Sequence, residues 1–263
     1  MNKFRWCFIG AGSLAKTVAF QLNRSGRHEI VSCYTRNYEK GVEFAKKYGG
    51  KAYKTPEEAI TAEGVDGVYV VTPHNAHYRY VKQALELGKP VFCEKSFTVT
   101  AEETDKLIAL AREKDLYLCE AMWTWFSPSA NQTKKWIDEQ KLGKIHSADF
   151  TYHVNIINGA ERVRDPKRAG GALLDITIYP VTYAYRLWGI PQKIESRGNL
   201  QNGIDKSEEI DIGWFIALII FGSFGAIIVL CALLVLLVIG ATALIGAYES
   251  KRLEKENENE RPD

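Results

Sequence analysis

The chain has 263 residues, 46% of them hydrophobic, and a formal net charge of +2. This length accommodates two domains of ordinary size with substantial cores. Basic and acidic residues nearly balance, so nothing in the charge indicates nucleic acid as a partner. The five cysteines lack paired metal-ligand spacing, which argues against a disulfide framework and a zinc site. We therefore expect a reducing, cytoplasmic compartment and no metal.

The N-terminal part of the chain alternates short apolar runs with amphipathic segments. The apolar runs are typical of parallel strands buried on both faces, and the amphipathic segments are typical of helices. The expected strands lie within residues 4–9, 29–34, 65–71, 90–93 and 116–119, and the expected helices within 14–22, 38–48, 76–87 and 101–114. This alternation predicts an α/β fold with a doubly wound parallel sheet, a Rossmann domain, over residues 1–120.

A Gly-x-Gly-x-x-Ala turn connects the first expected strand to the first helix. Gly10 permits a tight turn, Gly12 lets the backbone approach a pyrophosphate, and Ala15 lets the helix pack closely on its strand. The free N–H groups of the helix start, around Ser13 and Leu14, favour a phosphate. The pattern predicts a dinucleotide site, and a plain glycine turn is the alternative.

Arg36 bears on the choice of dinucleotide because it follows the second expected strand. An acidic residue at this point binds the ribose 2'-hydroxyl of NAD, whereas a guanidinium pairs with the 2'-phosphate of NADP. We therefore expect NADP rather than NAD. An exposed arginine that binds nothing is the alternative.

The second half of the chain has a different pattern. Residues 149–157 alternate apolar and polar side chains, which predicts a strand with one covered and one exposed face. A helix is expected over residues 173–188. We infer a separate α+β substrate domain with a mainly antiparallel sheet, which begins near residue 121 and extends to about residue 225.

Several residues have the chemistry and spacing of a reaction site. Lys95 follows the strand expected at 90–93, where ligands bind in parallel sheets, and Glu94 can orient or tune it. Asp175 and Tyr179 are four residues apart, so a carboxylate and a phenol share one helix face. The alternative for Glu94 and Lys95 is an ordinary charged loop. The alternative for Tyr179 is a place in a packed aromatic cluster.

Two further groups complete the candidate site. Residues after the strand at 65–71 are expected at the cofactor edge of the sheet: Thr72, Pro73, Asn75 and His77. An aromatic wall suited to a ring or to the apolar face of a sugar is expected from Trp123, Trp125 and Phe126.

Five ordered motifs resemble the glucose-fructose oxidoreductase/inositol dehydrogenase (Gfo/Idh/MocA) family, and within it the dihydrodiol dehydrogenase-like branch. The resemblance covers about residues 4–195, and its motifs lie at residues 10–15, 71–77, 88–95, 120–123 and 170–180. It implies an NADP-dependent oxidoreductase that transfers hydride between nicotinamide and a carbinol or carbonyl carbon. The implied substrate is a small cyclic polyol, a sugar or a dihydrodiol.

The resemblance also implies roles for individual residues. It assigns Lys95 to the neighbourhood of the nicotinamide and the reacting carbon, Tyr179 to the position of a catalytic His or Tyr, and Asp175 to a substrate-orienting carboxylate. Tyr179 is then the proton donor or acceptor, assisted by the positive charge of Lys95, which favours the phenolate. The residues after the strand at 65–71 help to build the nicotinamide-ribose environment. Two departures from the family are Ser96, where relatives carry Pro, and Trp125, where relatives often carry Arg.

We expect the C-terminal sequence to depart from the family as a truncated and strongly apolar end. Residues 211–230 resemble the family's strand-turn-strand, with the turn at 222–225, but residues 226–248 are uncharged. That segment is long enough to cross a hydrocarbon core, so two interpretations stay open: strands that form a homodimer interface, or a membrane anchor followed by a charged tail at 249–263. An altered reading frame is a third. The alternative function is a membrane-attached, cofactor-binding but catalytically weak sensor or interaction protein.

Overall fold

The computed structural model describes residues 2–152 and 161–213. Contacts divide the described chain into two units: residues 2–126 with 152 and 161–213, and residues 127–151. The domain boundary expected near residue 121 stays a prediction. The apolar segment 226–248, the tail 249–263 and the proposed dimer sheet lie outside the described residues. Among the residues that are described, no helix is both long and apolar enough to cross a membrane.

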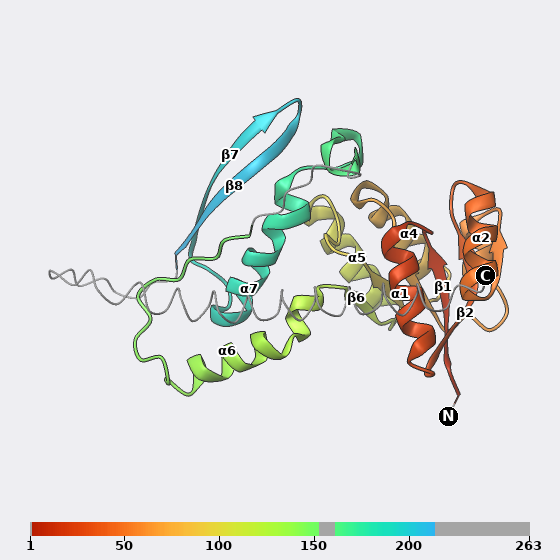
Figure 1. Cartoon of the computed structure of the whole chain (residues 1–263), viewed down its shortest axis with the longest axis horizontal. Helices are drawn as coiled ribbons and strands as arrows, with labels where there is room; N and C mark the ends of the chain where they lie inside the picture. The colour runs from red at the N-terminus through yellow and green to blue at the C-terminus, as the bar shows by residue number, and fades with distance from the viewer. Residues whose placement is uncertain (1, 153–160, 214–263) are drawn as a thin grey trace, which may run out of the picture. The chain divides into compact units, whose positions relative to one another are not determined.

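The first unit is built on a six-stranded parallel sheet with the strand order β3-β2-β1-β4-β5-β6. This order, which runs outward in both directions from β1 and β4, is that of a doubly wound sheet, so the fold expected from the alternation is confirmed. Figure 1 follows the chain through this sheet from the red β1. The strands are β1 (Phe4–Ile9), β2 (His28–Tyr34), β3 (Lys51–Tyr53), β4 (Gly67–Val70), β5 (Val91–Cys93) and β6 (Leu118–Glu120).

Helices connect the strands, and local capping sets their ends. The side chain of Asn37 accepts a hydrogen bond from the backbone N–H of Lys40 at the start of α2, and Gly49, at φ +105°, ends that helix. The short edge strand β3 and the helix α3 were not expected, although Thr55 forms a capping box there. The helices of this part are α1 (Ser13–Arg24), α2 (Tyr38–Tyr48), α3 (Pro56–Ile60), α4 (His77–Glu86) and α5 (Ala101–Glu113).

The core of this part lies on both faces of the sheet. Successive side chains of a strand point to opposite faces, and Cys7 and Ile9 pack in one cluster while Phe8 packs in the other. Val68 and Val70 likewise oppose Tyr69. Burial on both faces explains why these strands are continuously apolar in the sequence. Cys7, Cys33 and Cys93 are buried thiols without disulfide partners.

The rest of the first unit contains a helix and a hairpin. A π-helical turn, η5 (Leu173–Thr177), leads into α7 (Ile178–Trp188), which confirms the helix expected over 173–188 but not its regular geometry. Strands β7 (Lys193–Gln201) and β8 (Ile204–Gly213) then pair antiparallel across Asn202–Gly203, both of which have positive φ. An Asn-Gly pair is a strong local signal of a two-residue hairpin, although this hairpin is not among the elements expected from the sequence. Residues 211–213 therefore end β8, and the turn expected at 222–225 lies outside the described residues.

One expected strand is not observed where the structure describes it. Residues 149–152 have no strand assignment, and 153–157 lie outside the described part. A segment with alternating side chains forms a strand only where a neighbouring strand supplies hydrogen bonds to its backbone. Among the described residues, no strand pairs with residues 149–152. The second unit contains the helix α6 (Pro128–Asp138), whose first turn is capped by Ser127.

Candidate functional site

The glycine turn after β1 has the tight geometry that the sequence predicts. Gly10 has φ +117°, and a Cβ atom built on it would lie 2.6 Å from the carbonyl oxygen of Val71. Its N–H donates to the carbonyl oxygen of Tyr34 at 2.8 Å, which joins the end of β1 to the end of β2. Only glycine satisfies this backbone angle and this close approach.

Gly12 differs from Gly10 because nothing among the described residues requires a glycine there. Its φ is −75°, and an added Cβ would meet no atom within 4 Å. No side chain from residues 2–152 or 161–213 caps the N-terminus of α1, where Ser13 and Leu14 are exposed, whereas Ala15 is fully buried. The open space and the uncapped helix start form a cradle that fits the pyrophosphate of a dinucleotide.

Arg36 lies just beyond the carboxyl end of β2, close in sequence to the Tyr34 carbonyl that binds Gly10. Its side chain is exposed. The next residue, Asn37, is committed to capping α2. Arg36 thus follows the strand beside β1, at the end of the sheet that carries the glycine turn, the region where a dinucleotide's ribose binds in this type of fold.

The loop after β4 contains an orphaned polar atom. The hydroxyl of Thr72 is buried and has no hydrogen-bond partner in the described structure, so its hydrogen-bonding capacity is unused there. Pro73 precedes the short helix η1 (His74–Ala76), and the amide of Asn75 donates to the carbonyl oxygen of Lys167 at 2.7 Å. Asn75 therefore ties this loop to the segment that precedes η5.

His77 has a structural position within this edge of the sheet. It is fully buried, and its ring nitrogens lie 2.8 Å from the carbonyl oxygens of Thr72 and Ser96. Burial lowers the pKa of His77. The imidazole links the loops after β4 and β5 and has no ring nitrogen left for a ligand.

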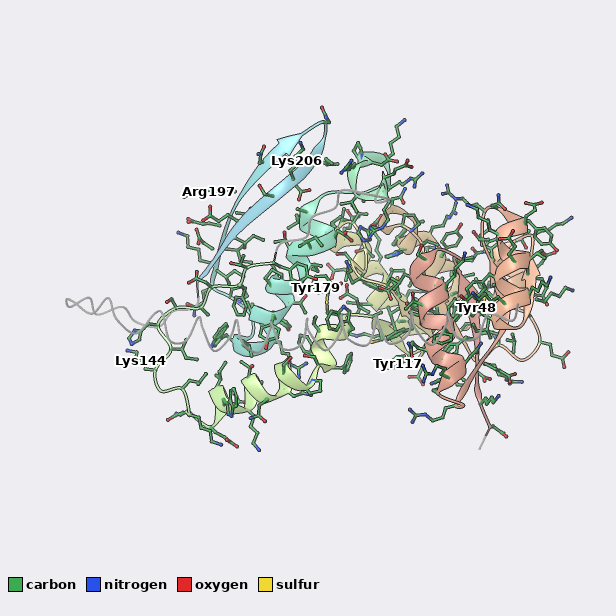
Figure 2. The ribbon with its side chains drawn as sticks, in the orientation of Figure 1. Tyr48, Tyr117, Lys144, Tyr179, Arg197 and Lys206 are labelled. Atoms are coloured by element: carbon green, nitrogen blue, oxygen red, sulfur yellow. The ribbon has the colours of Figure 1, made fainter. Side chains whose placement is uncertain are left out.

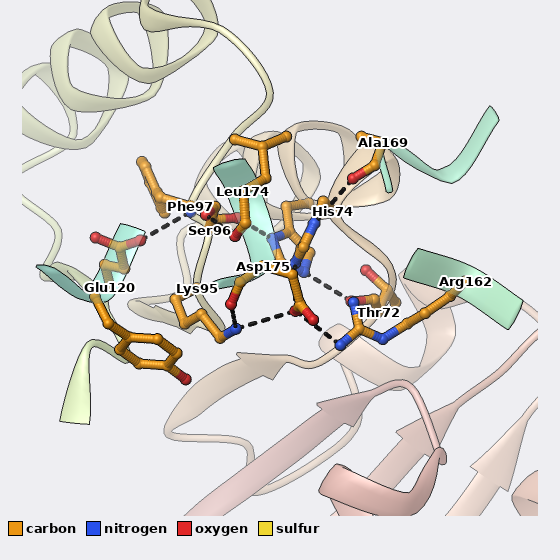
Figure 3. Close-up of polar contacts among 12 residues, drawn as sticks. Thr72, His74, Lys95, Ser96, Phe97, Glu120, Arg162, Ala169, Leu174 and Asp175 are labelled. Atoms are coloured by element: carbon orange, nitrogen blue, oxygen red, sulfur yellow. Dashed lines mark hydrogen bonds and ion pairs between the residues drawn. The ribbon is translucent and has the colours of Figure 1, made fainter. Parts of the chain in front are cut away.

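Lys95 and Asp175 form the centre of the site, as Figure 3 shows. The Lys95 ammonium donates to the backbone carbonyl oxygen of Asp175 at 2.6 Å and to its carboxylate Oδ1 at 3.1 Å. The two side chains are only 11% and 7% exposed. Ser96, which follows a cis peptide bond, donates its hydroxyl to the carbonyl oxygen of Leu174 at 2.5 Å. The loop after β5 is thus bound to the π-helical turn η5 at two successive residues.

Two neighbours of Asp175 were missed in the sequence. Arg162, in η3 (Glu161–Arg164), donates from Nη2 to Oδ1 of Asp175 at 2.9 Å. His74 Nε2 lies 4.0 Å from the same oxygen, and its Nδ1 lies 3.1 Å from the carbonyl oxygen of Ala169. Burial lowers the pKa of His74 to about 4, so this histidine is neutral at pH 7. The sequence offers no signal for Arg162, because its spacing does not distinguish it from the other basic residues of its segment. His74 could have been found, because it belongs to the motif at residues 71–77.

Tyr179 lies at the start of α7, away from the hairpin residues Arg197 and Lys206 (Figure 2). The Lys95 ammonium is 4.7 Å from the centre of the Tyr179 ring, and it donates hydrogen bonds to Asp175. The Tyr179 hydroxyl accepts a hydrogen bond from the Trp123 indole at 3.3 Å. The aromatic ring of Tyr152 packs on Tyr179 at 5.5 Å between centroids. Asp175 and Tyr179 therefore both contact Lys95 across a π-helical turn, a feature that is frequent at functional sites.

Only part of the expected aromatic wall adjoins this cluster. Trp123 is 61% exposed and contacts Tyr179. Trp125, in the same short helix η2 (Trp123–Phe126), instead packs on Tyr185 and under the guanidinium of Arg186. Phe126 is 65% exposed.

Glu94 faces the sheet rather than the Lys95 ammonium. Its carboxylate accepts a hydrogen bond from the hydroxyl of Tyr69. Burial raises the pKa of Glu94, against the opposing effects of the Tyr69 hydroxyl and of the N–H and charge of Lys95. Glu120 accepts a hydrogen bond from the N–H of Phe97 at 2.9 Å, and burial likewise raises its pKa. These two carboxylates brace the loop that carries Lys95.

The fold and the site define a class of protein: a dinucleotide-type, doubly wound α/β domain with a lysine, a carboxylate and a tyrosine gathered at the carboxyl end of its sheet. Two family models match the sequence. One, described as an oxidoreductase family with an NAD-binding Rossmann fold, matches residues 4–121, and the other, the GFO/IDH/MocA C-terminal domain, matches residues 130–231. The chain belongs to the Gfo/Idh/MocA oxidoreductase family.

The chain is also similar to individual members of the family. It is 33% identical over 204 residues to D-xylose 1-dehydrogenase (NADP(+)) of Hypocrea jecorina, which covers 69% of this chain and 52% of that protein. It is 33% identical over 207 residues to human trans-1,2-dihydrobenzene-1,2-diol dehydrogenase, which covers 76% of this chain and 62% of that protein. The chain thus spans about half to three fifths of the length of these relatives.

A similar solved structure is that of a 3-ketoreductase from Actinomadura kijaniata in complex with NADP and TDP-benzene. It has a TM-score of 0.66 and 28% sequence identity, over 75% of this chain and 60% of that one.

Proposed function

We propose that this chain is an NADP-dependent oxidoreductase that transfers hydride between the nicotinamide and a carbinol or carbonyl carbon of a small cyclic polyol, sugar or dihydrodiol. The observation that carries the proposal is the Lys95–Asp175 ion pair beside Tyr179, at the carboxyl end of the sheet that holds the glycine turn. The similarity to an NADP(+) xylose dehydrogenase and to dihydrodiol dehydrogenases supports it.

The cofactor-binding residues have separate tasks in this proposal. The turn at Gly10 and Gly12 and the uncapped start of α1 receive the pyrophosphate, and Arg36 pairs with the 2'-phosphate. The buried hydroxyl of Thr72 hydrogen-bonds the nicotinamide end of the cofactor. The bound dinucleotide supplies the hydride chemistry, and the protein supplies position and proton transfer.

The substrate-side residues then bind and orient the reacting group. Lys95, held by Asp175, hydrogen-bonds the substrate oxygen, and Tyr179 donates or accepts its proton. Both cations that contact Asp175 bind Oδ1, so we assign Oδ2 to accept a hydrogen bond from a substrate hydroxyl. Trp123, which is exposed beside Tyr179, provides an apolar surface for the ring of the substrate.

Titration with NADPH and NADH, followed by quenching of tryptophan fluorescence, tests the cofactor site. Arg36→Ala is expected to weaken NADPH binding about ten- to a hundredfold and to leave NADH binding unchanged, because one charged hydrogen-bond donor to the 2'-phosphate is lost. Lys46→Ala, which removes an exposed charge near the far end of α2, is the control and should bind both nucleotides like the wild type. Equal weakening of both nucleotides in Arg36→Ala, or failure of the folded wild type to bind either, contradicts the assignment.

Tyr179→Phe tests the proton-transfer step. We expect kcat to fall about a hundredfold while NADPH affinity stays within twofold, because the hydroxyl is removed and the ring over which Lys95 lies is kept. Tyr185→Phe, on the same helix but packed on Trp125, is the matched control and should retain full turnover. Steady-state kinetics on a panel of polyols, sugars and dihydrodiols measures the effect, and undiminished turnover in Tyr179→Phe removes that residue from the mechanism.

A further inference from the structure

The carboxylate of Asp175 is held by two cations from different elements. Lys95 reaches it from the loop after β5, and Arg162 reaches it from η3. Both contacts are made to Oδ1, at 3.1 Å and 2.9 Å. Figure 3 shows the lysine and the arginine on either side of this carboxylate. The three residues form an alternating row of positive, negative and positive charge.

The two cations constrain Asp175 in different ways. Lys95 is a point charge on a flexible chain, whereas the guanidinium of Arg162 is planar and donates in fixed directions. The Asp175 side chain is 7% exposed, and a carboxylate so buried depends on its hydrogen bonds and charge partners. The Arg162 side chain is 43% exposed, so it holds the carboxylate from the solvent side.

We propose that Arg162 is a positioning residue that fixes the Asp175 carboxylate, so that Lys95 is kept beside Tyr179 and Oδ2 of Asp175 is directed to the substrate. This inference rests on the proposed function for its effect on turnover. The effect of Arg162 on the Asp175 carboxylate itself depends only on the contacts of Arg162 and Lys95 with that carboxylate.

The electrostatics of the cluster agree with this role. Burial raises the pKa of Asp175, but the charge of Lys95 and the hydrogen bond and charge of Arg162 outweigh burial, and the net pKa is lowered. The third facing group, His74 of η1, is neutral at pH 7. When Arg162 is removed, burial is opposed by Lys95 alone, so the pKa of Asp175 rises. Because the ionised carboxylate is needed, the acidic limb of the activity profile moves to higher pH.

The test compares Arg162→Met with the wild type by two measurements. Carboxyl ¹³C NMR, with the signal assigned by Asp175→Asn, follows the titration of Asp175 in the folded protein without any need for turnover. We expect the midpoint to rise by about one pH unit in Arg162→Met. The pH dependence of kcat should show the same shift of its acidic limb, and kcat at neutral pH should fall about ten- to a hundredfold, with unchanged NADPH affinity.

Three further variants control for charge and for stability. Arg168→Met removes a charge of the same segment that pairs with Asp165, and it should behave like the wild type in both measurements. Arg162→Lys should restore most of the Asp175 midpoint but less of kcat, because the charge returns without the planar donor. Should Arg162→Met prove too unstable to titrate, Arg162→Gln removes the charge and keeps a hydrogen-bond donor.

The two proposals fail in distinguishable ways. An unchanged Asp175 midpoint in folded Arg162→Met or Arg162→Gln overturns the positioning role, whatever the turnover. A wild type that binds NADPH but turns over no member of the substrate panel contradicts the proposed function, and the NMR titration still decides whether Arg162 holds Asp175.

Discussion

Replacement of Lys95 by methionine is expected to lower kcat by about a thousand- to ten-thousandfold. The ammonium is one of two cations held by Asp175, and its side chain is only 11% exposed, so little water can take its place. The loss combines the proton-transfer and electrostatic contributions that one such group makes. Methionine keeps the length of the side chain, so NADPH affinity should stay within a few-fold. Steady-state kinetics and fluorescence titration measure the two quantities separately.

The matched control for this variant is Lys106→Met. Lys106 also pairs with a carboxylate, that of Glu102, but on the exposed surface of α5, where ion pairs contribute little. It should retain full turnover. Thermal unfolding of both variants separates lost chemistry from lost structure, since Asp175 keeps Arg162 as a partner when Lys95 is removed. A folded Lys95→Met protein with turnover near the wild-type value contradicts the role of Lys95.

Substitution of the two glycines in the turn after β1 should separate folding from cofactor binding. Gly12→Val is expected to change the free energy of unfolding by no more than about 0.5 kcal/mol, because its φ of −75° suits any residue and its Cβ enters open space. The same side chain occupies the space through which a pyrophosphate approaches the backbone. NADPH affinity should therefore fall more than about a hundredfold, a loss of close contacts and N–H hydrogen bonds together.

Gly10→Ala should instead lower the stability of the fold. Its φ of +117° and the carbonyl oxygen of Val71 at 2.6 Å from the added Cβ should cost about 3 kcal/mol of unfolding free energy. Any loss of NADPH binding then accompanies a loss of stability. Denaturant unfolding and fluorescence titration distinguish the two variants. Gly12→Val that binds NADPH normally means that the turn is a plain structural one.

The elements that the sequence predicts best are those whose signals are local. The helix at Tyr38–Tyr48 was expected with the bounds observed, since Asn37 caps its start and Gly49 ends it. The hairpin of β7 and β8 was missed although Asn202 and Gly203 carry a local signal. The strand expected at 149–157 depended on a partner strand, which side-chain alternation alone does not supply.

The candidate site was predicted unevenly for a similar reason. Lys95, Asp175 and Tyr179 were named from motifs, and the structure brings them together. Trp125 and Trp123 are two residues apart in one short helix, yet their rings pack on different turns of α7. Adjacency in the sequence does not decide which neighbour a side chain meets, because that depends on its direction within the helix.

By itself, the sequence determined the doubly wound sheet, the glycine turn and the residue types of the site, because these follow from local periodicity, backbone freedom and motif. The tertiary structure alone decided that Arg162 contacts Asp175, that Lys95 lies over the ring of Tyr179, and that His77 links two loops. Lys95 and Asp175 are separated by 80 positions in the chain. Contacts across such distances depend on how strands, turns and helices pack, and on which buried charges must then be neutralised.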